Sequence, residues 1–104
     1  MNFELLFWLV VAHFVGDYGL QSDWVAKNKC KSWYVLTAHT FIWMGCIALP
    51  LTLFGTLNWQ MVVILSTHWV FDWAKCKGFT NLLEDQITHF IQLGFVFMMS
   101  GVIQ

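Results

Sequence analysis

Four long apolar segments make up most of this chain, and seven ionisable residues interrupt them. The segments cover residues 3–20, 33–54, 57–74 and 82–103. The interruptions are all four histidines and three of the six acidic residues of the chain: His13, Asp17, His39, His68, Asp72, Asp85 and His89. Because an ionisable group in an apolar environment is costly, it is usually retained for a function. The fold must therefore provide these ionisable side chains with polar or charged partners inside an apolar structure.

The composition is typical of a membrane protein. Hydrophobic residues make up 59% and charged residues 11% of 104 residues, whereas soluble domains average about 45–50% and about 25%. Each segment is close to the roughly 20 residues of a spanning helix, and helices satisfy their own backbone groups in lipid. We predict an all-α fold, in which residues 1–104 form a single domain with four transmembrane helices in a compact bundle.

The linkers predict the orientation of the chain. Residues 22–31 predict a short interfacial segment, with Ser22 or Asp23 as its helix cap. The five basic residues all lie in the first and third linkers: Lys27, Lys29, Lys31, Lys75 and Lys77. By the positive-inside rule both linkers face the cytoplasm, and both termini lie outside. In that reducing compartment Cys30 and Cys76 are expected to be reduced packing thiols, and Cys46 to lie in the membrane.

The ionisable residues form pairs that are four residues apart: His13/Asp17, His68/Asp72 and Asp85/His89. Such a spacing places both side chains on one helix face, and alternating helix directions bring all seven residues to a similar depth. Helical bundles build metal sites from imidazole and carboxylate ligands in this way. We predict one or two divalent ions, zinc foremost. The predicted ligands are His13, Asp17, His39, His68, Asp72, Asp85 and His89.

Neighbouring polar residues are expected to support this site. Gln21 and Gln86 are predicted to orient the ligands through hydrogen bonds. Four threonines beside the histidines are predicted to bond to carbonyls of their own helices: Thr37, Thr40, Thr67 and Thr88. The lysines of both linkers form a rim that would attract anions, although they also serve as simple determinants of topology.

Two other interpretations of the polar set stay open. A metal-free hydrogen-bond network or a proton relay would also place ionisable residues inside a bundle. If the chain is an enzyme, a metal-activated water is the natural attacking group, because no Ser or Cys pairs with a His as a nucleophile. The base would then be one of Asp17, Asp72 and Asp85.

Several motifs together resemble the DUF3307 family of small bacterial and phage membrane proteins. The first motif runs from Ala12-His13 through Gly16-Asp17 and Leu20-Gln21 to Trp24, and His39 follows it. The later motifs are Thr67-His68 with Asp72, and Asp85-Gln86 with His89. The family pattern is similar to that of membrane-bound metal-dependent hydrolases, which also carry His and Asp on their helices. The resemblance implies a bacterial inner membrane location.

The sequence thus predicts a membrane-embedded metal-dependent hydrolase. Its substrate would be membrane-associated or phosphate-bearing and would be met at the inner leaflet. One alternative is a non-enzymatic, phage-encoded membrane effector that binds a host membrane or cytoplasmic protein, with a structural His/Asp site. Another is an oligomeric conductor of ions or protons. The expected partners are the lipid bilayer and further copies of the chain, and not nucleic acid, because no basic run is present.

Overall fold

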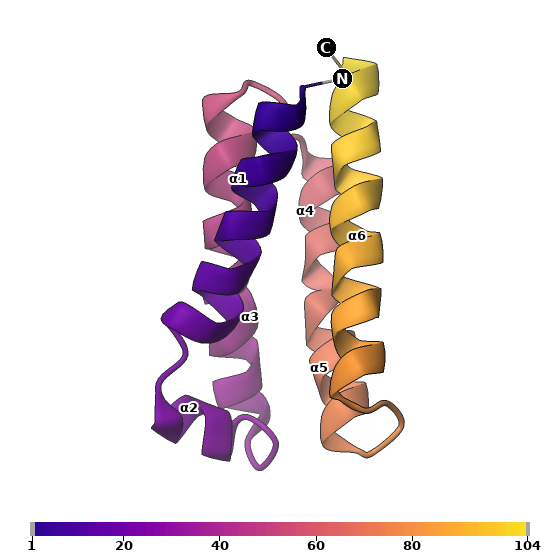
Figure 1. Ribbon diagram of the computed structural model, residues 1–104. Coiled ribbons are helices and arrows are strands. Elements are labelled where there is room, and N and C mark those ends of the chain that lie inside the picture. The colour runs from indigo at the N-terminus through magenta and orange to yellow at the C-terminus, as the bar shows by residue number, and fades with distance from the viewer. Residues whose placement is uncertain (1, 104) are drawn as a thin grey trace.

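Helices account for almost all of the computed structural model, which describes residues 2–103 (Figure 1). In chain order the elements are α1 (Phe3–Phe14), the π-helix η1 (Val15–Gly19), α2 (Asp23–Asn28), α3 (Trp33–Leu53), α4 (Trp59–Ser66), α5 (His68–Cys76) and α6 (Leu82–Ile103). The long helices run side by side in a body of 40 × 22 × 21 Å. The start of α1 and the end of α6 lie at one end, and α2 and the α5–α6 turn lie at the other.

Short polar side chains fix where the helices begin. Each cap accepts a hydrogen bond from a backbone N–H of the first helical turn, a group that has no partner within the helix. The caps are Asn2 for α1, Ser22 for α2, Ser32 for α3 and Asn58 for α4. The prediction that Ser22 caps a short helix is confirmed.

The core changes character along the long axis of the molecule. One half is an apolar cluster in which side chains from α1, α3, α4 and α6 interdigitate. Its members include Leu5, Leu9, Trp43, Ile47, Leu51, Met61, Leu65, Leu93, Val96 and Phe97. The other half, towards α2 and the α5–α6 turn, buries the ionisable residues instead. We call these the apolar half and the polar half.

A close approach of the chain to α3 positions the junction of the two halves. Gly16 lies in η1, and a Cβ atom there would come within 3.0 Å of the Trp43 Cα and 3.3 Å of the Cys46 Cβ. Only glycine allows this contact without a shift of one element. The π-helix η1, which contains Gly16, closes with a hydrogen bond from Leu20 N–H to Val15 C=O. Such turns are frequent at functional sites.

The prediction of four transmembrane helices is wrong. Within residues 2–103, α3 alone is both long and apolar enough to cross a membrane. The first predicted span ends as an α-helix at Phe14, and the third is divided near Thr67 into helices of 8 and 9 residues. Helix α6 has 22 residues but carries acids, amides and a histidine. The hydropathy argument treated the chain as four continuous spans despite these polar residues. The structure instead leaves the α-helical conformation before Asp17 and begins a new helix at His68.

Much of the outer surface is nevertheless apolar. Large hydrophobic side chains protrude along α1, α3 and α6, with exposed fractions of 59% for Phe7, 67% for Phe41 and 67% for Ile91. Scattered exposed hydrophobic residues are ordinary, but a contiguous apolar surface marks a contact with lipid or another protein.

A disulfide bond joins Cys30 to Cys76. The prediction of reduced thiols at these two positions is therefore wrong, whereas Cys46 is free. The two cysteines are 46 positions apart in sequence, but their linkers lie at the same end of the molecule, with the Cα atoms 5.2 Å apart. Tertiary structure creates this proximity, and the spacing of the cysteines gives no sign of it.

Candidate metal centre

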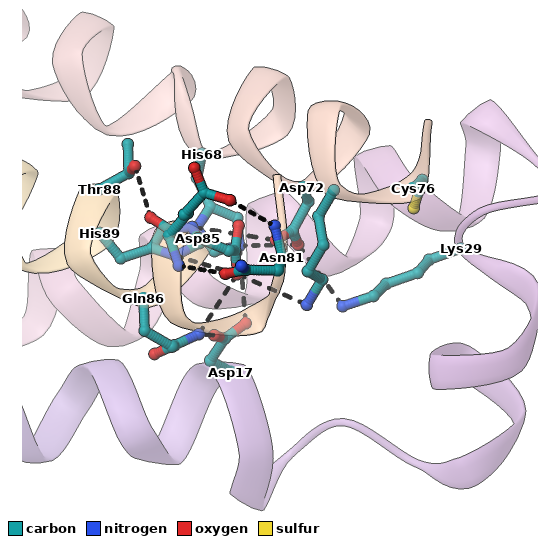
Figure 2. A network of polar contacts seen from close by, with 12 residues as sticks. Asp17, Lys29, His68, Asp72, Cys76, Asn81, Asp85, Gln86, Thr88 and His89 are labelled. Carbon is teal, nitrogen blue, oxygen red and sulfur yellow. Dashed lines mark hydrogen bonds and ion pairs between the residues drawn. The ribbon is translucent and has the colours of Figure 1, made fainter. Parts of the chain in front are cut away.

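Side chains from four elements meet in the polar half (Figure 2). The helices deliver six of the seven predicted ligands to one buried cluster. Asp17 comes from η1, His39 from α3, His68 and Asp72 from α5, and Asp85 and His89 from α6. Each of these residues is at most 4% exposed. We call these six residues the centre.

Four of them converge as closely as metal ligands do. The Nε2 atom of His39 lies 3.2 Å from Oδ1 of Asp17 and 3.0 Å from Oδ2 of Asp72. The Nε2 atom of His68 lies 3.3 Å from Nε2 of His39 and 3.2 Å from the same Asp72 oxygen. Its distance to Oδ1 of Asp17 is 3.8 Å. Two imidazole nitrogens and two carboxylate oxygens therefore surround one point.

These separations fit a small divalent cation. Zinc bonds of about 2.0–2.1 Å in a tetrahedron place neighbouring ligand atoms about 3.3–3.4 Å apart. The five separations given above range from 3.0 to 3.8 Å. The donor set, two imidazoles with two carboxylates, is one that zinc and other transition metals accept. These buried groups can hold a metal ion.

A second set of three residues adjoins the first. Asp72, Asp85 and His89 also offer ligand atoms within 4.8 Å of one another. Asp72 belongs to both sets and lies between them. Its α5 position, one turn after His68, places its carboxylate between α3 and α6.

His13 lies outside both sets, contrary to its prediction as a ligand. Its Nδ1 atom accepts a hydrogen bond from the Trp43 indole N–H at 3.1 Å, and its Nε2–H donates to Oε1 of Gln86 at 3.0 Å. An indole N–H can only donate, so the tautomer follows from the partners. Both ring nitrogens are thus engaged. The Gln86 amide links His13 to the centre, because its Nε2 also donates to Asp17 at 3.2 Å.

The two glutamines predicted to support the site take different places. Gln86 lies directly against the centre and donates from Nε2 to Asp17 at 3.2 Å and to Asp85 at 3.3 Å. Gln21 lies one step further out, where its Oε1 accepts a hydrogen bond from Lys29 Nζ at 2.8 Å. Each amide thereby orients a charged group that faces the centre.

The four threonines bond as predicted. Each hydroxyl donates to a carbonyl three or four residues earlier in its own helix or helix end. These residues are Thr37, Thr40, Thr67 and Thr88. Thr37 also accepts from the Trp69 indole N–H. The hydroxyls are thus occupied with backbone or packing roles.

The environment sets the charge of the ligands. Burial alone would raise the pKa of Asp72, but the neighbouring His39 and His68 imidazoles lower it below its usual range. The Asp72 carboxylate is therefore ionised at neutral pH. Burial, reinforced by the nearby His68, lowers the pKa of His89 to about 4. His89 is accordingly neutral at pH 7, which is the form in which an imidazole binds a metal.

Two lysines of the predicted rim reach into the centre. Lys29 is 7% exposed, and its Nζ lies 3.6 Å from Oδ2 of Asp72. Lys75 Nζ lies 3.5 Å from Oδ2 of Asp85. The other three rim lysines, Lys27, Lys31 and Lys77, are exposed. Two of the five rim lysines therefore pair with carboxylates of the centre, and the side chains of the other three are exposed.

A cavity of about 210 Å³ lies beside this end of the molecule. Its lining includes Lys29, Lys31 and Lys77, the tryptophans Trp33, Trp69 and Trp73, and both halves of the disulfide. Because Lys29 also pairs with Asp72, the cavity borders the centre. The ammonium groups of these lysines favour an anionic ligand.

Comparison with known proteins identifies the family. A family model described as a protein of unknown function (DUF3307) matches residues 5–104. The chain belongs to the DUF3307 family. No curated protein and no solved structure matches it.

This DUF3307 chain also uses residues that the sequence interpretation left out. Trp43 is fully buried, bonds to His13 and stacks on the His68 ring with 4.2 Å between ring centroids. Its position four residues after His39 on the same helix face could have indicated this role. The Lys29–Asp72 pair had no comparable signal, because its members are 43 positions apart in sequence.

Proposed function

We propose that this DUF3307 protein is a metal-dependent hydrolase whose ion is bound by Asp17, His39, His68 and Asp72. The convergence of four ligand atoms, from elements far apart in sequence, carries this proposal. A metal-free network is a weaker explanation, because both Nε2 atoms face carboxylate oxygens and need a proton to bond to them. Two N–H donors would then point at each other across 3.3 Å. A cation satisfies both lone pairs at once.

The chain's own residues supply the other parts of a hydrolytic site. A bound divalent ion would supply a water of lowered pKa as the attacking group. Asp85 is the carboxylate outside the four-ligand set, and its Oδ1 atom has no hydrogen-bond partner. With a single ion, Asp85 is therefore the base that accepts the proton. Lys75 and Gln86, which contact its other oxygen, hold it in place.

The substrate we propose is phosphate-bearing and membrane-associated. The cavity with three lysines favours an anionic group beside the centre. The exposed hydrophobic side chains and helix α3, which is long and apolar enough to cross a membrane, favour a location in the membrane. All five lysines lie at the end that holds the centre, where they would attract a phosphate-bearing headgroup.

Metal analysis and hydrolysis together test this function. The full chain, with a tag free of histidine, is purified without chelator, and its transition-metal content is measured. We expect about one equivalent or more, and less than about 0.2 equivalents would contradict the proposal. The zinc-loaded protein is then assayed on a phosphate monoester, a phosphate diester and phospholipid vesicles, with the Asp72→Asn variant as the control. Hydrolysis that disappears in this variant supports the proposal.

A structural metal site would give a different result. In that case the protein would bind zinc and melt at a higher temperature with it, yet no substrate of the panel would be hydrolysed above the Asp72→Asn background. That outcome would favour the effector alternative. A His68→Ala variant that folds and retains its biological effect would favour it independently.

A further inference from the structure

We propose that the centre holds a second divalent ion, bound by Asp72, Asp85 and His89, with the Asp72 carboxylate shared between the two ions. The inference rests on the proposed function, because it places the second ion next to the first. It changes the role of Asp85 from a base to a ligand, and it narrows the substrate to a phosphate ester.

The geometry of α5 and α6 brings these three residues together. His89 follows Asp85 by one helical turn, and its Nδ1 atom lies 3.5 Å from Oδ2 of Asp85. Its Nε2 atom lies 3.9 Å from Oδ1 of Asp72. The Oδ2 atom of Asp72 faces His39 and His68 instead. The two oxygens of one carboxylate therefore point into two different ligand sets.

His89 is the observation that requires an additional partner. Its side chain is fully buried, yet neither ring nitrogen makes a hydrogen bond. Oδ1 of Asp85 and both carboxylate oxygens of Asp72 are buried without one as well. An unsatisfied buried polar atom costs about 1–3 kcal/mol, and more when it is charged. One cation, bound by one nitrogen of His89 and one oxygen of each carboxylate, would satisfy one atom of each residue.

Charge balance points in the same direction. Three buried carboxylates, Asp17, Asp72 and Asp85, face only two ammonium groups within 4 Å among the described residues. Lys29 pairs with Asp72 on the side of the first ligand set. Lys75, which pairs with Asp85, is 27% exposed, so its ammonium can turn towards solvent. An ion bound by Asp85 would then replace the Lys75 ammonium as the positive partner of this carboxylate.

The two sets are close enough to form one cluster. The imidazoles of His68 and His89, one from each set, lie side by side with 4.4 Å between ring centroids. Paired metal ions in hydrolytic enzymes lie about 3.5–4 Å apart and stabilise both the attacking and the leaving oxygen of a phosphoryl group. A shared carboxylate and adjacent lysines thus favour a phosphate ester as substrate.

Zinc stoichiometry tests the second site without any assay of activity. The full-length protein is stripped with a chelator, freed of it, loaded with Zn²⁺ and desalted, and bound zinc is counted by elemental analysis. We expect two equivalents in the wild type. All four histidines of the chain are buried, so surface imidazoles will not inflate the count.

Two histidine variants provide a matched comparison. His89→Ala and His13→Ala both truncate a fully buried imidazole, and the two rings lie 5.6 Å apart. We expect His89→Ala to bind one equivalent and His13→Ala to bind two. His89→Gln, which preserves more of the packing, is expected to bind one. Helical circular dichroism verifies that each variant is folded.

The outcomes separate this inference from the proposed function. One equivalent in the wild type would overturn the second ion and leave the first in place, whereas none would overturn both. Two equivalents in folded His89→Gln would place the second ion elsewhere and would also overturn the inference. The Asp85→Asn variant distinguishes the two roles of Asp85. One equivalent of bound zinc would support its role as a ligand of the second ion, whereas two equivalents would overturn that role and leave Asp85 as the base.

Discussion

Leu9 and Asp72 are both buried, but the two halves of the core around them are stabilised differently. In the apolar half, side chains such as Leu9, Ile47 and Leu65 are satisfied by packing alone. In the polar half, the environment of Asp72 and His89 leaves ligand atoms without partners. The cavities show the same difference. A groove of about 360 Å³ between α1 and α3 is lined by apolar side chains and Cys46, whereas the one beside the centre contains lysines.

The difference indicates that the two halves of the core contribute to stability in different ways. The apolar half can hold α1, α3, α4 and α6 together without any ligand, because its contacts are non-directional. If the polar half binds cations as proposed, its stability should depend on metal concentration. Substitutions in the two halves should therefore respond differently to added zinc.

The largest expected effect is the loss of this dependence in Asp72→Ala. Removal of the carboxylate shared by both ligand sets should abolish stabilisation by zinc. In the wild type that stabilisation reaches about 4 kcal/mol when free zinc exceeds the dissociation constant a thousandfold. Thermal unfolding with and without zinc measures it. An undiminished zinc effect in Asp72→Ala would show that the halves do not differ in this way.

Leu9→Ala should produce the opposite pattern. Leu9 has no exposed surface, and truncation of a buried leucine lowers the free energy of unfolding by about 2–5 kcal/mol. We expect the same loss with and without zinc, and an unchanged zinc stoichiometry. Chemical denaturation at two zinc concentrations gives both values. A zinc-dependent loss would mean that the two halves are energetically coupled.

Removal of the disulfide should have a somewhat smaller effect. Cys30→Ser with Cys76→Ser opens a loop of 46 residues, for which chain entropy suggests a loss of about 2–4 kcal/mol. We expect weaker zinc binding as well, because Lys29 and Lys75 flank these cysteines and face the centre. Denaturation and zinc titration of the double variant measure the two effects. The single variant Cys46→Ser, which touches no disulfide, is the control.

The smallest effect is expected from Gly16→Ala at the junction of the halves. The added methyl group would meet the Trp43 Cα at 3.0 Å and push η1 away from α3. Overpacking of this kind lowers stability by about 1–3 kcal/mol. Because Asp17 is the next residue, zinc affinity should fall while the stoichiometry stays at the wild-type value. Gly45→Ala, which has open space at its Cβ, should change neither quantity.

The sequence was informative where regular helix geometry holds. The His68/Asp72 pair lies on one regular α-helix, and its Nε2 and Oδ2 atoms are 3.2 Å apart, as the four-residue spacing suggests. The bounds of α3 and α6 also agree with the predicted segments 33–54 and 82–103 to within one residue. Local rules were sufficient in these places because neighbouring elements did not alter the backbone.

Other features depended on tertiary contacts that no local rule contains. The same four-residue spacing did not bring His13 and Asp17 into one ligand set, and no local rule predicts the π-helix at Val15 or the approach of Gly16 to Trp43. Hydropathy failed near Thr67, where one predicted helix becomes α4 and α5. The Cys30–Cys76 bond joins two linkers whose proximity only the folded chain creates.

That bond also gives the chain a topology of one ring and two arms. The ring, from Cys30 to Cys76, contains His39, His68 and Asp72. The N-terminal arm contributes Asp17, and the C-terminal arm contributes Asp85 and His89. A mechanical pull on the two ends would load the ring only through the disulfide and would peel the arms away from it. The centre therefore joins both arms to the ring at the polar end, in addition to the packing of the apolar half, and each arm that leaves takes its ligands with it.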